Sequence, residues 1–203
     1  MSELSSMQSI SLAINEESIT TLSQQAEVPI KFEYDRILEL ELLDNGLNGF
    51  KFSEKILEHK RTKDYDAIGG DHPSTWEQRF DVSKWGFIVA RSEDKRIGGA
   101  VVAFDCPNMN MLDERKDLAV LWDLRVSPEF RSAKVGKLLF SAVEKWASSR
   151  GCVQLKIETQ NNNVAACRFY AKQGCTLAAV NRFAYKNLPD EIQMIWIKNL
   201  QAL

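Results

Sequence analysis

A short basic turn joins a strand-like segment to a helix-like segment in the second half of the chain. The stretch LRVSPEFRSAKVGKLLFSAVEKWASSRG covers residues 124–151 and passes from apolar residues through Pro128 into a turn at 131–136. A helix N-terminus offers unpaired backbone N–H groups and the positive end of the helix dipole, and both favour an anion such as phosphate. Arg131 and Lys134 add positive charge there. These residues indicate an anion site, with a turn that merely joins two elements as an equal alternative.

Two acidic residues lie inside segments that are otherwise apolar. Asp123 stands in the run LWDLRV and Glu158 in the run LKIETQ. A carboxylate in such a strand is costly unless it is paired or functional. Either acid could take the proton that an amine loses before it attacks a carbonyl, or could bind a cationic substrate. The alternative for both is a hydrogen bond to a neighbouring loop or helix end, while His59 and His72 are expected at the surface.

The segments around these residues predict alternating strands and helices. Residues 85–105 show two apolar runs around a charged turn, which is typical of a β-hairpin, and residues 117–127 form another apolar strand. From Val135 the apolar residues follow a helical spacing, and Gly151 is a natural helix end. A strand at 152–160, a helix capped by the following asparagines and two last strands complete the pattern. This order predicts an α/β fold with one sheet flanked by helices.

The first third of the chain gives weaker patterns. Residues 28–40 are strand-like, and the charged residues 50–70 are expected to be partly helical. Pro73 is suited to the start of a helix, with Asp71 or Ser74 as its cap.

Length and charge narrow the class of protein. The chain has 203 residues, which fits a single domain at 28–203 preceded by an extension or arm at 1–27 that is rich in Ser, Gln and Glu. The formal net charge of -2 argues against a nucleic-acid-binding protein, whose footprint is usually basic. The N-terminus lacks the basic start and apolar core of a signal peptide, and no apolar run is long enough for a membrane span.

The cysteines argue for a reducing compartment. None of them forms a C-x-x-C pair, so a metal site is not expected, and buried free thiols are favoured over disulfides. The four are Cys106, Cys152, Cys167 and Cys175. This usage suits the cytoplasm.

The turn and helix at 124–151 resemble the acetyl-CoA motif of the GNAT superfamily of N-acetyltransferases. In that superfamily a strand is followed by a glycine-rich loop, whose backbone amides cradle the pyrophosphate of coenzyme A, and then by an amphipathic helix. Gly136 matches the loop pattern, while Ser132 and Lys134 stand where the family prefers glycine. Glycine allows the backbone to approach a ligand closely.

A second stretch, ETQNNNVAACRFYAKQGC, resembles a later motif of the same superfamily, and its first part is similar to streptothricin acetyltransferases. The pattern N-x-x-A-x-x-F/L-Y-x-x-x-G is matched by Asn163, Ala166, Phe169, Tyr170 and Gly174. Cys175 replaces the aromatic residue that usually follows. Together the two motifs cover about the last 120 residues of the 203, and the first 80 or so match little.

The resemblance implies a role for each matching residue. Tyr170 would protonate the departing thiolate of coenzyme A, and Asp123 or Glu158 would serve as the proton acceptor for the amine. Strand backbone would contact the pantetheine arm, the turn would hold the pyrophosphate, and the second motif would contact the rest of coenzyme A. The implied acetyl-CoA residues are Leu124, Arg125, Val126, Arg131, Ser132, Ala133, Lys134, Val135, Gly136, Lys137, Asn163, Ala166 and Phe169.

The resemblance also implies a fold and an activity. The sheet should be mixed and mostly antiparallel, and the strands carrying residues 121–126 and 155–158 should be parallel neighbours that diverge at their carboxyl ends. The implied enzyme moves the acetyl group of acetyl-CoA to a primary amine of a small molecule, such as a streptothricin-like antibiotic, by direct attack in a ternary complex. It needs no metal, nucleic acid or membrane, and a homodimer is left open. The alternatives are a peptide or protein N-acetyltransferase and a non-catalytic module that binds acyl-CoA.

Overall fold

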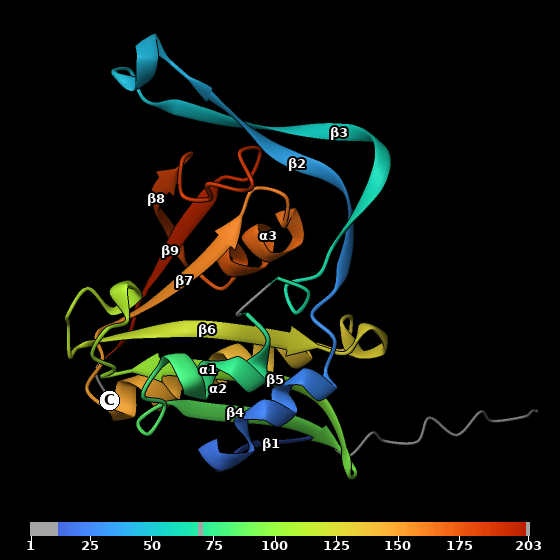
Figure 1. Cartoon of the computed structure of the whole chain (residues 1–203), viewed down its shortest axis with the longest axis vertical. Coiled ribbons are helices and arrows are strands. Elements are labelled where there is room, and N and C mark those ends of the chain that lie inside the picture. The colour runs from blue at the N-terminus through green and yellow to red at the C-terminus, as the bar shows by residue number, and fades with distance from the viewer. Residues whose placement is uncertain (1–11, 69–70, 202–203) are drawn as a thin grey trace, which may run out of the picture.

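Seven strands form one sheet in the computed structural model, which describes residues 12–68 and 71–201 (Figure 1). In sheet order they are β1 (Leu12–Glu16), β4 (Gly86–Ser92), β5 (Lys95–Phe104), β6 (Leu118–Val126), β7 (Gln154–Gln160), β9 (Gln193–Asn199) and β8 (Thr176–Asn181). β6 and β7 pair in parallel, and every other neighbouring pair of these strands is antiparallel. The predicted mixed, mostly antiparallel sheet is confirmed.

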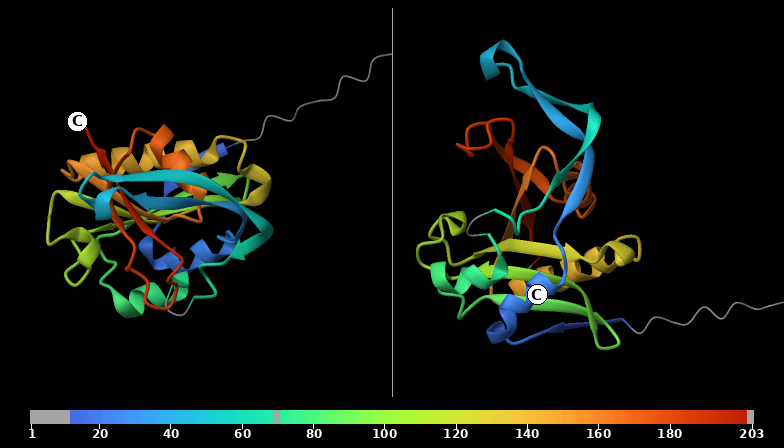
Figure 2. Two further views of the ribbon diagram at one scale, coloured as in Figure 1. Left: turned by 90° about the horizontal axis from the view of Figure 1, so that it is seen from above. Right: turned by 45° about the vertical axis from the view of Figure 1, so that its right-hand side comes forward.

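Helices cover both faces of this sheet (Figure 2). The long helices α2 (Val135–Ser149) and α3 (Val164–Lys172) lie on one face, and the short helices η1 (Ile19–Glu27) and α1 (Trp76–Arg79) lie on the other. α2 begins at the predicted residue, and Asn163 caps α3 as predicted, because its side-chain oxygen accepts a hydrogen bond of 3.1 Å from the backbone N–H of Ala166.

The sheet separates two apolar clusters. β4 shows the division, because Ile88 and Ala90 belong to the cluster under α2, whereas Phe87 and Val89 belong to the cluster under α1 and η1. This alternation is the period of two expected of a strand, and it makes β4 buried on both faces. The four cysteines are free and buried, as predicted.

The N-terminal segment contributes to both the sheet and the core. β1 pairs antiparallel with β4, from Leu12 opposite Ser92 to Glu16 opposite Ile88. In η1, Leu22 and Gln25 are fully buried. Residues 1–11 of the extension inferred from the sequence lie outside the described residues.

A long two-stranded ribbon, β2 (Phe32–Leu42) with β3 (Phe50–Lys63), crosses over α3 and the end of β7 (Figure 1). The prediction of partial helix at 50–70 was wrong for β3. Its lysines and glutamates suit a helix individually, but cross-strand pairs such as Leu40 with Phe52 decide the conformation. The outer edge of β2 is anchored at Leu38, whose backbone exchanges hydrogen bonds of 2.9 and 3.1 Å with Asn161 in the turn after β7.

A 3₁₀ turn at Pro73–Thr75 leads into α1. Pro73 begins it as predicted, but the cap is His72 rather than Asp71 or Ser74. The ring nitrogen Nδ1 of His72 accepts a hydrogen bond of 3.3 Å from the backbone N–H of Ser74, so this orphan donor is already satisfied.

Candidate active site

The parallel pair β6–β7 splits open at its carboxyl ends. Pairing stops at Leu121 and Ile157, although β6 continues to Val126 and β7 to Gln160. A cleft of about 840 Å³ occupies this split. The predicted divergence of the two strands is therefore confirmed, and Figure 1 shows the two arrows moving apart.

A bulge in β6 starts the divergence. Val101 of β5 pairs with Asp123 and Val102 pairs with Leu121, which leaves Trp122 as an extra residue in β6. A bulge bends its strand and increases the local twist, and bulges are frequent beside active sites. Sequence patterns carry no reliable signal for this extra residue.

The bulged strand turns backbone groups toward the cleft. The N–H of Ser127 donates a hydrogen bond of 2.8 Å to the carbonyl of Ile97, which defines a bonded pair in the β5–β6 ladder. Bonded and non-bonded pairs alternate along antiparallel strands, so the N–H and C=O of Leu124 and Val126 point away from β5 and into the split. The same alternation directs the backbone of Arg125 to β5.

Most of the residues singled out in the sequence line this cleft. They are Asp123, Leu124, Arg125, Val126, Arg131, Ser132, Lys134, Gly136, Lys137, Glu158, Asn163, Ala166, Phe169 and Tyr170. Ala133 and Val135 are not among its lining residues, and Val135 is instead buried in the core under α2.

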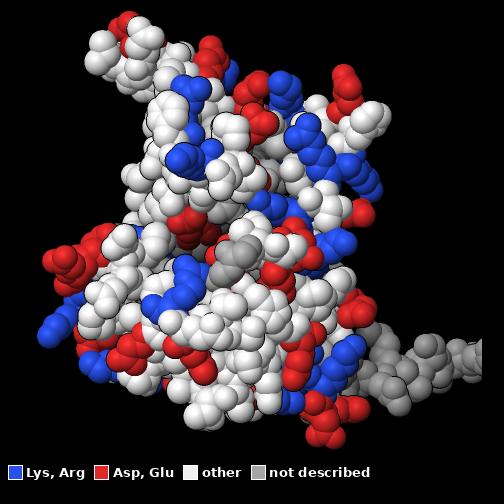
Figure 3. All heavy atoms as spheres, viewed as in Figure 1, with Lys and Arg blue, Asp and Glu red and all other residues white. Residues whose placement is uncertain are grey.

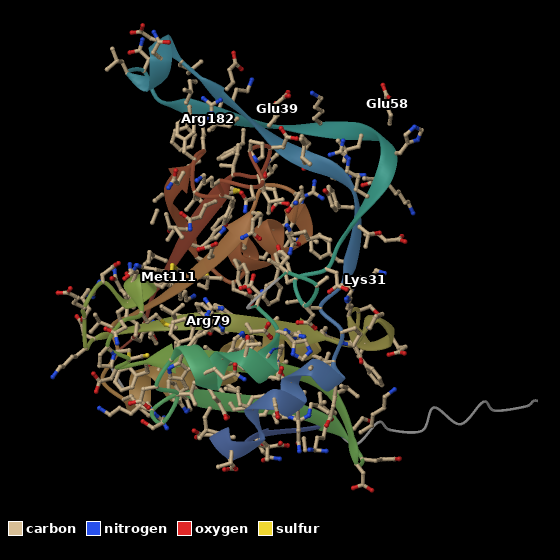
Figure 4. All side chains as sticks on the ribbon, in the orientation of Figure 1. Lys31, Glu39, Glu58, Arg79, Met111 and Arg182 are labelled. Atoms are coloured by element: carbon tan, nitrogen blue, oxygen red, sulfur yellow. The ribbon has the colours of Figure 1, made fainter. Side chains whose placement is uncertain are left out.

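The turn before α2 contains a left-handed residue. Lys134 has φ 63° and ψ 7°, a conformation that costs residues other than glycine about 1–2 kcal/mol. Glycine avoids this cost, which gives a physical reason for its use at such a position. Arg131 is fixed by hydrogen bonds of 3.2 Å to the carbonyl of Val126 and 3.1 Å to that of Lys31, which lies beside the end of β6 in Figure 4. The N-terminus of α2 therefore opens on the cleft with cationic side chains around it.

Tyr170 reaches the cleft from α3. Its ring packs against Phe140 and Phe169, with centroids 5.8 and 5.2 Å away, and only 7% of the residue is exposed. Burial raises the pKa of Tyr170 well above its usual range, and the negative charge of Asp123 adds to the effect. Its hydroxyl therefore stays protonated at neutral pH and is available as a proton donor.

Asp123 is held by two partners. Both of its oxygens lie within 2.9–3.0 Å of Nε of Arg125, and Oδ1 accepts a further bond of 2.6 Å from Nε2 of Gln25. Arg125 in turn forms a two-pronged pair with Asp66, at 2.7 and 2.8 Å. Asp123 and Arg125 are thus members of a buried ion network that ties β6 to η1 and to the segment after β3.

Glu158 is held by neutral donors. Oε1 accepts bonds of 2.5 Å from the hydroxyl of Tyr185 and 3.3 Å from Gln160, and Oε2 accepts one of 2.7 Å from Gln193. Burial raises the pKa of Tyr185, with a further contribution from the charge of Glu158, so Tyr185 remains a donor at neutral pH. These bonds solvate the carboxylate of Glu158, and no cationic side chain within residues 12–68 and 71–201 forms an ion pair with it.

The cleft is also lined by residues that the sequence did not single out for this role. They are aromatic, acidic or apolar: Phe32, Glu33, Tyr65, Asp71, Trp76, Met111 and Trp122. Nearly all come from the part of the chain before β6, where no motif was recognised. The cleft therefore has a basic end at the turn before α2, and acidic and aromatic side chains from the ribbon and from the segments around α1 and β6 line it as well. Over the face in Figure 3, acidic and basic side chains are interspersed.

The sequence model of the acetyltransferase (GNAT) family matches residues 54–175. The chain belongs to this family. The resemblance of the two motifs to GNAT enzymes is confirmed, and the split between β6 and β7 is the feature of this GNAT domain around which its candidate site is built.

Similar sequences among characterised proteins are streptothricin acetyltransferases. The chain is 41% identical over 83 residues to the enzyme of Escherichia coli, which is 39% of this chain and 48% of that one. It is 35% identical over 80 residues to streptothricin acetyltransferase A of Bacillus subtilis (strain 168), which is 38% and 46% of the two chains. The chain thus spans about half the length of these curated relatives.

Solved structures extend the likeness over nearly the whole chain. Nourseothricin acetyltransferase superposes with a TM-score of 0.72 at 19% identity, covering 94% of this chain and 99% of that one. A protein of Bacillus anthracis str. Ames, described as a streptothricin acetyltransferase and crystallised with acetyl coenzyme A, superposes with a TM-score of 0.71 at 25% identity, covering 96% and 100%. These solved structures share the fold over nearly the whole chain.

Within residues 12–68 and 71–201, no three His, Cys, Asp or Glu side chains are grouped so that they could hold a metal ion. No helix in the same ranges is both long and apolar enough to cross a membrane.

Proposed function

We propose that the protein transfers the acetyl group of acetyl-CoA to a primary amine of a small cationic molecule of the streptothricin type. The main observation that supports this proposal is the split between β6 and β7. The backbone of Leu124 and Val126, the side chain of Tyr170 and the carboxylate of Glu158 all line the cleft in this split. The similarity to streptothricin acetyltransferases supports the acceptor class, and the acetyl-CoA complex of the Bacillus anthracis protein supports the co-substrate.

Acetyl-CoA would occupy the basic end of the cleft. The free backbone groups of Leu124 and Val126 can hydrogen-bond the amides of the pantetheine arm, as an added strand would. The amides of residues 131–136 and the N-terminus of α2 suit the pyrophosphate, with Lys134 and Lys137 supplying charge. This assignment uses the anion site that the basic turn suggested.

The chemistry follows from the groups in the cleft. The amine attacks the thioester carbonyl, a tetrahedral oxyanion forms, and the carbon–sulfur bond breaks to give an amide and the thiolate of coenzyme A. Tyr170 donates its proton to that thiolate, since burial keeps its hydroxyl protonated. Tyr170 is reprotonated from solvent after the products leave.

The amine must lose a proton before it attacks, and Glu158 is the better acceptor of the two candidate acids. Asp123 already accepts from a guanidinium and an amide, so its role is to anchor Arg125. Glu158 has only neutral donors and therefore attracts an ammonium group without competition from a bonded cation. Glu158 would bind the ammonium and take its proton directly or through water.

The test is release of free coenzyme A from acetyl-CoA in the presence of single amines. The panel contains streptothricin, nourseothricin, lysine and a peptide with a free N-terminus, with thermal melts in acetyl-CoA alongside. We expect turnover with the streptothricin-type amines, and stabilisation of about 2.7 kcal/mol at an acetyl-CoA concentration of about 100 times Kd. Turnover with the peptide alone would assign the acceptor to peptides. Stabilisation without any turnover would make the protein a binding module.

A further inference from the structure

Two consecutive residues bridge the split between β6 and β7. Tyr65 and Asp66, here called the clasp, follow β3 after one intervening residue, Asp64. The carboxylate of Asp66 pairs with Arg125 of β6, and the hydroxyl of Tyr65 donates a hydrogen bond to Oε1 of Gln160 at the end of β7. The clasp therefore contacts both strands beyond the point where they stop pairing with each other.

The β6 side of the clasp is rigid. Arg125 uses Nη1 and Nη2 for the two oxygens of Asp66, at 2.7 and 2.8 Å, and Nε for Asp123. Its side chain is only 1% exposed, and Nη1 also donates to the carbonyl of Val28 at 3.3 Å. A planar guanidinium held on three sides has one orientation, so it fixes the position of Asp66 relative to β6.

The β7 side of the clasp leads to the carboxylate proposed to receive the amine. Gln160 accepts from Tyr65 through Oε1 and donates through Nε2 to Tyr185 at 2.7 Å and to Glu158 at 3.3 Å. An amide with its oxygen engaged by Tyr65 can present only its NH₂ group to Glu158. The orientation of Gln160, and with it the hydrogen bonding of Glu158, is therefore set by Tyr65.

We infer that the clasp fixes the spacing of β6 and β7 at the acceptor end of the cleft and thereby positions Glu158 for the amine. This inference rests on the proposed function, and it assigns Tyr65, Asp66 and Arg125 as the residues that position Glu158. Tyr65 also lines the cleft and stacks near Phe32, with ring centroids 6.0 Å apart, so it forms part of the wall that the amine meets. Acetyl-CoA would contact backbone groups of β6 and of the turn before α2, and neither Tyr65 nor Asp66 supplies such a group, so we expect its binding to change little when the clasp is altered.

The test separates the two substrates. Asp66→Asn keeps the shape of the side chain but turns one prong of the pair into an NH₂ group facing a guanidinium. Steady-state kinetics with the best amine should show kcat/KM for that amine lowered about 10- to 100-fold, as a displacement of about 1 Å at a reacting group can cause. The Kd of acetyl-CoA, from titration calorimetry, should stay within about twofold of wild type, and the calorimetric stoichiometry counts the folded molecules.

The matched control is Asp117→Asn. Asp117 also forms a two-bond pair with an arginine, Arg115, but it is exposed and lies just before β6, away from the split. Its kinetics should equal wild type. An amine kcat/KM in Asp66→Asn that equals wild type per acetyl-CoA-binding molecule would overturn the inference, and so would an equal loss of acetyl-CoA affinity.

Tyr65→Phe gives an independent test of the clasp if the Asp66→Asn variant folds poorly. It deletes only the hydroxyl that orients Gln160, so amine kcat/KM should fall about 3- to 10-fold, as for one lost hydrogen bond, while acetyl-CoA Kd is unchanged. No change would overturn the clasp. If the wild type acetylates no amine at all, the proposed function fails instead. The clasp is then judged by amide exchange at residues 64–68, which Asp66→Asn should accelerate relative to β4, and equal exchange would refute it.

Discussion

Replacing Gly99 with alanine would place a methyl group on the side chain of Gln25. A Cβ built at Gly99 lies 2.0 Å from Oε1 of Gln25 and 2.9 Å from its Cδ. Gln25 is fully buried, and its Nε2 is bonded to Asp123, so the amide has no free space to move into. Either the β5 backbone shifts or Gln25 leaves Asp123.

Both responses are costly. Overpacking of a tight core costs about 1–3 kcal/mol. A lost hydrogen bond to a charged group costs about 1.5–3 kcal/mol. Because one response replaces the other, the cheaper one sets the cost, and Gly99→Ala should lower the free energy of unfolding by about 1–3 kcal/mol. At about 2–4 °C per kcal/mol for a chain of this size, the expected fall in Tm is about 2–12 °C.

Urea and thermal denaturation of four proteins test this: wild type, Gly99→Ala, Gln25→Ala and the double variant. In the Gln25→Ala background the obstacle is absent, so the added methyl group should cost less than about 1 kcal/mol, a coupling typical of residues in contact. Gly136→Ala is the matched control, since its Cβ would lie 3.7 Å from Phe169 and Val126, an ordinary contact. A Gly99→Ala cost that is the same in both backgrounds would refute the reasoning.

Three further predictions follow from single side chains. Tyr170→Phe should lower kcat about 10²- to 10⁴-fold with little change in KM. The loss should be the same from pH 6 to 9, because burial keeps the wild-type hydroxyl protonated over that range. Normal turnover per folded molecule would show that another group protonates the thiolate. Lys134→Glu should raise the KM of acetyl-CoA, more strongly at low salt, whereas a constant KM would place the pyrophosphate elsewhere. Burial raises the pKa of Glu17, but hydrogen bonds and charges from Arg91 and Arg96 outweigh burial, so the net pKa is lowered. The ionised Glu17 therefore stabilises the fold above its unfolded pKa, and this stabilisation is lost as the pH falls through the folded pKa. Glu17→Gln should therefore lower Tm at pH 7 and differ little from wild type near pH 3, and a pH-independent difference would contradict this linkage.

Local patterns in the sequence predicted the part of the site that is built locally. The spacing from Val135 defined α2, and a helical crossover between two strands required β6 and β7 to be parallel neighbours. The basic turn and Tyr170 lie within this region, so their common cleft followed from the topology.

Long-range contacts escaped prediction because no local pattern encodes them. The sequence allows either a functional role or a structural hydrogen bond for Asp123. Its partner Gln25 lies 98 residues away, in the segment that the sequence predicts to be an extension. Asp66 is 59 residues from Arg125. β3 is rich in residues that also suit a helix, and only the presence of β2 beside it decides for strand.

Much of the cleft wall proposed to face the amine comes from chain segments before β6, whereas the residues proposed to bind acetyl-CoA come from β6 onward, and this division separates two kinds of evolutionary change. Substitutions at Phe32, Glu33, Asp71 or Trp76 would change the part of the cleft wall proposed to face the amine, while the residues proposed to bind acetyl-CoA in the turn, α2 and α3 stay unchanged. Under the proposed function, a lineage exposed to new amines could therefore change its acceptor while keeping acetyl-CoA as the donor. For a laboratory library aimed at new acceptors, randomising these four positions while keeping Tyr65 and Asp66 would vary the wall and leave the clasp intact.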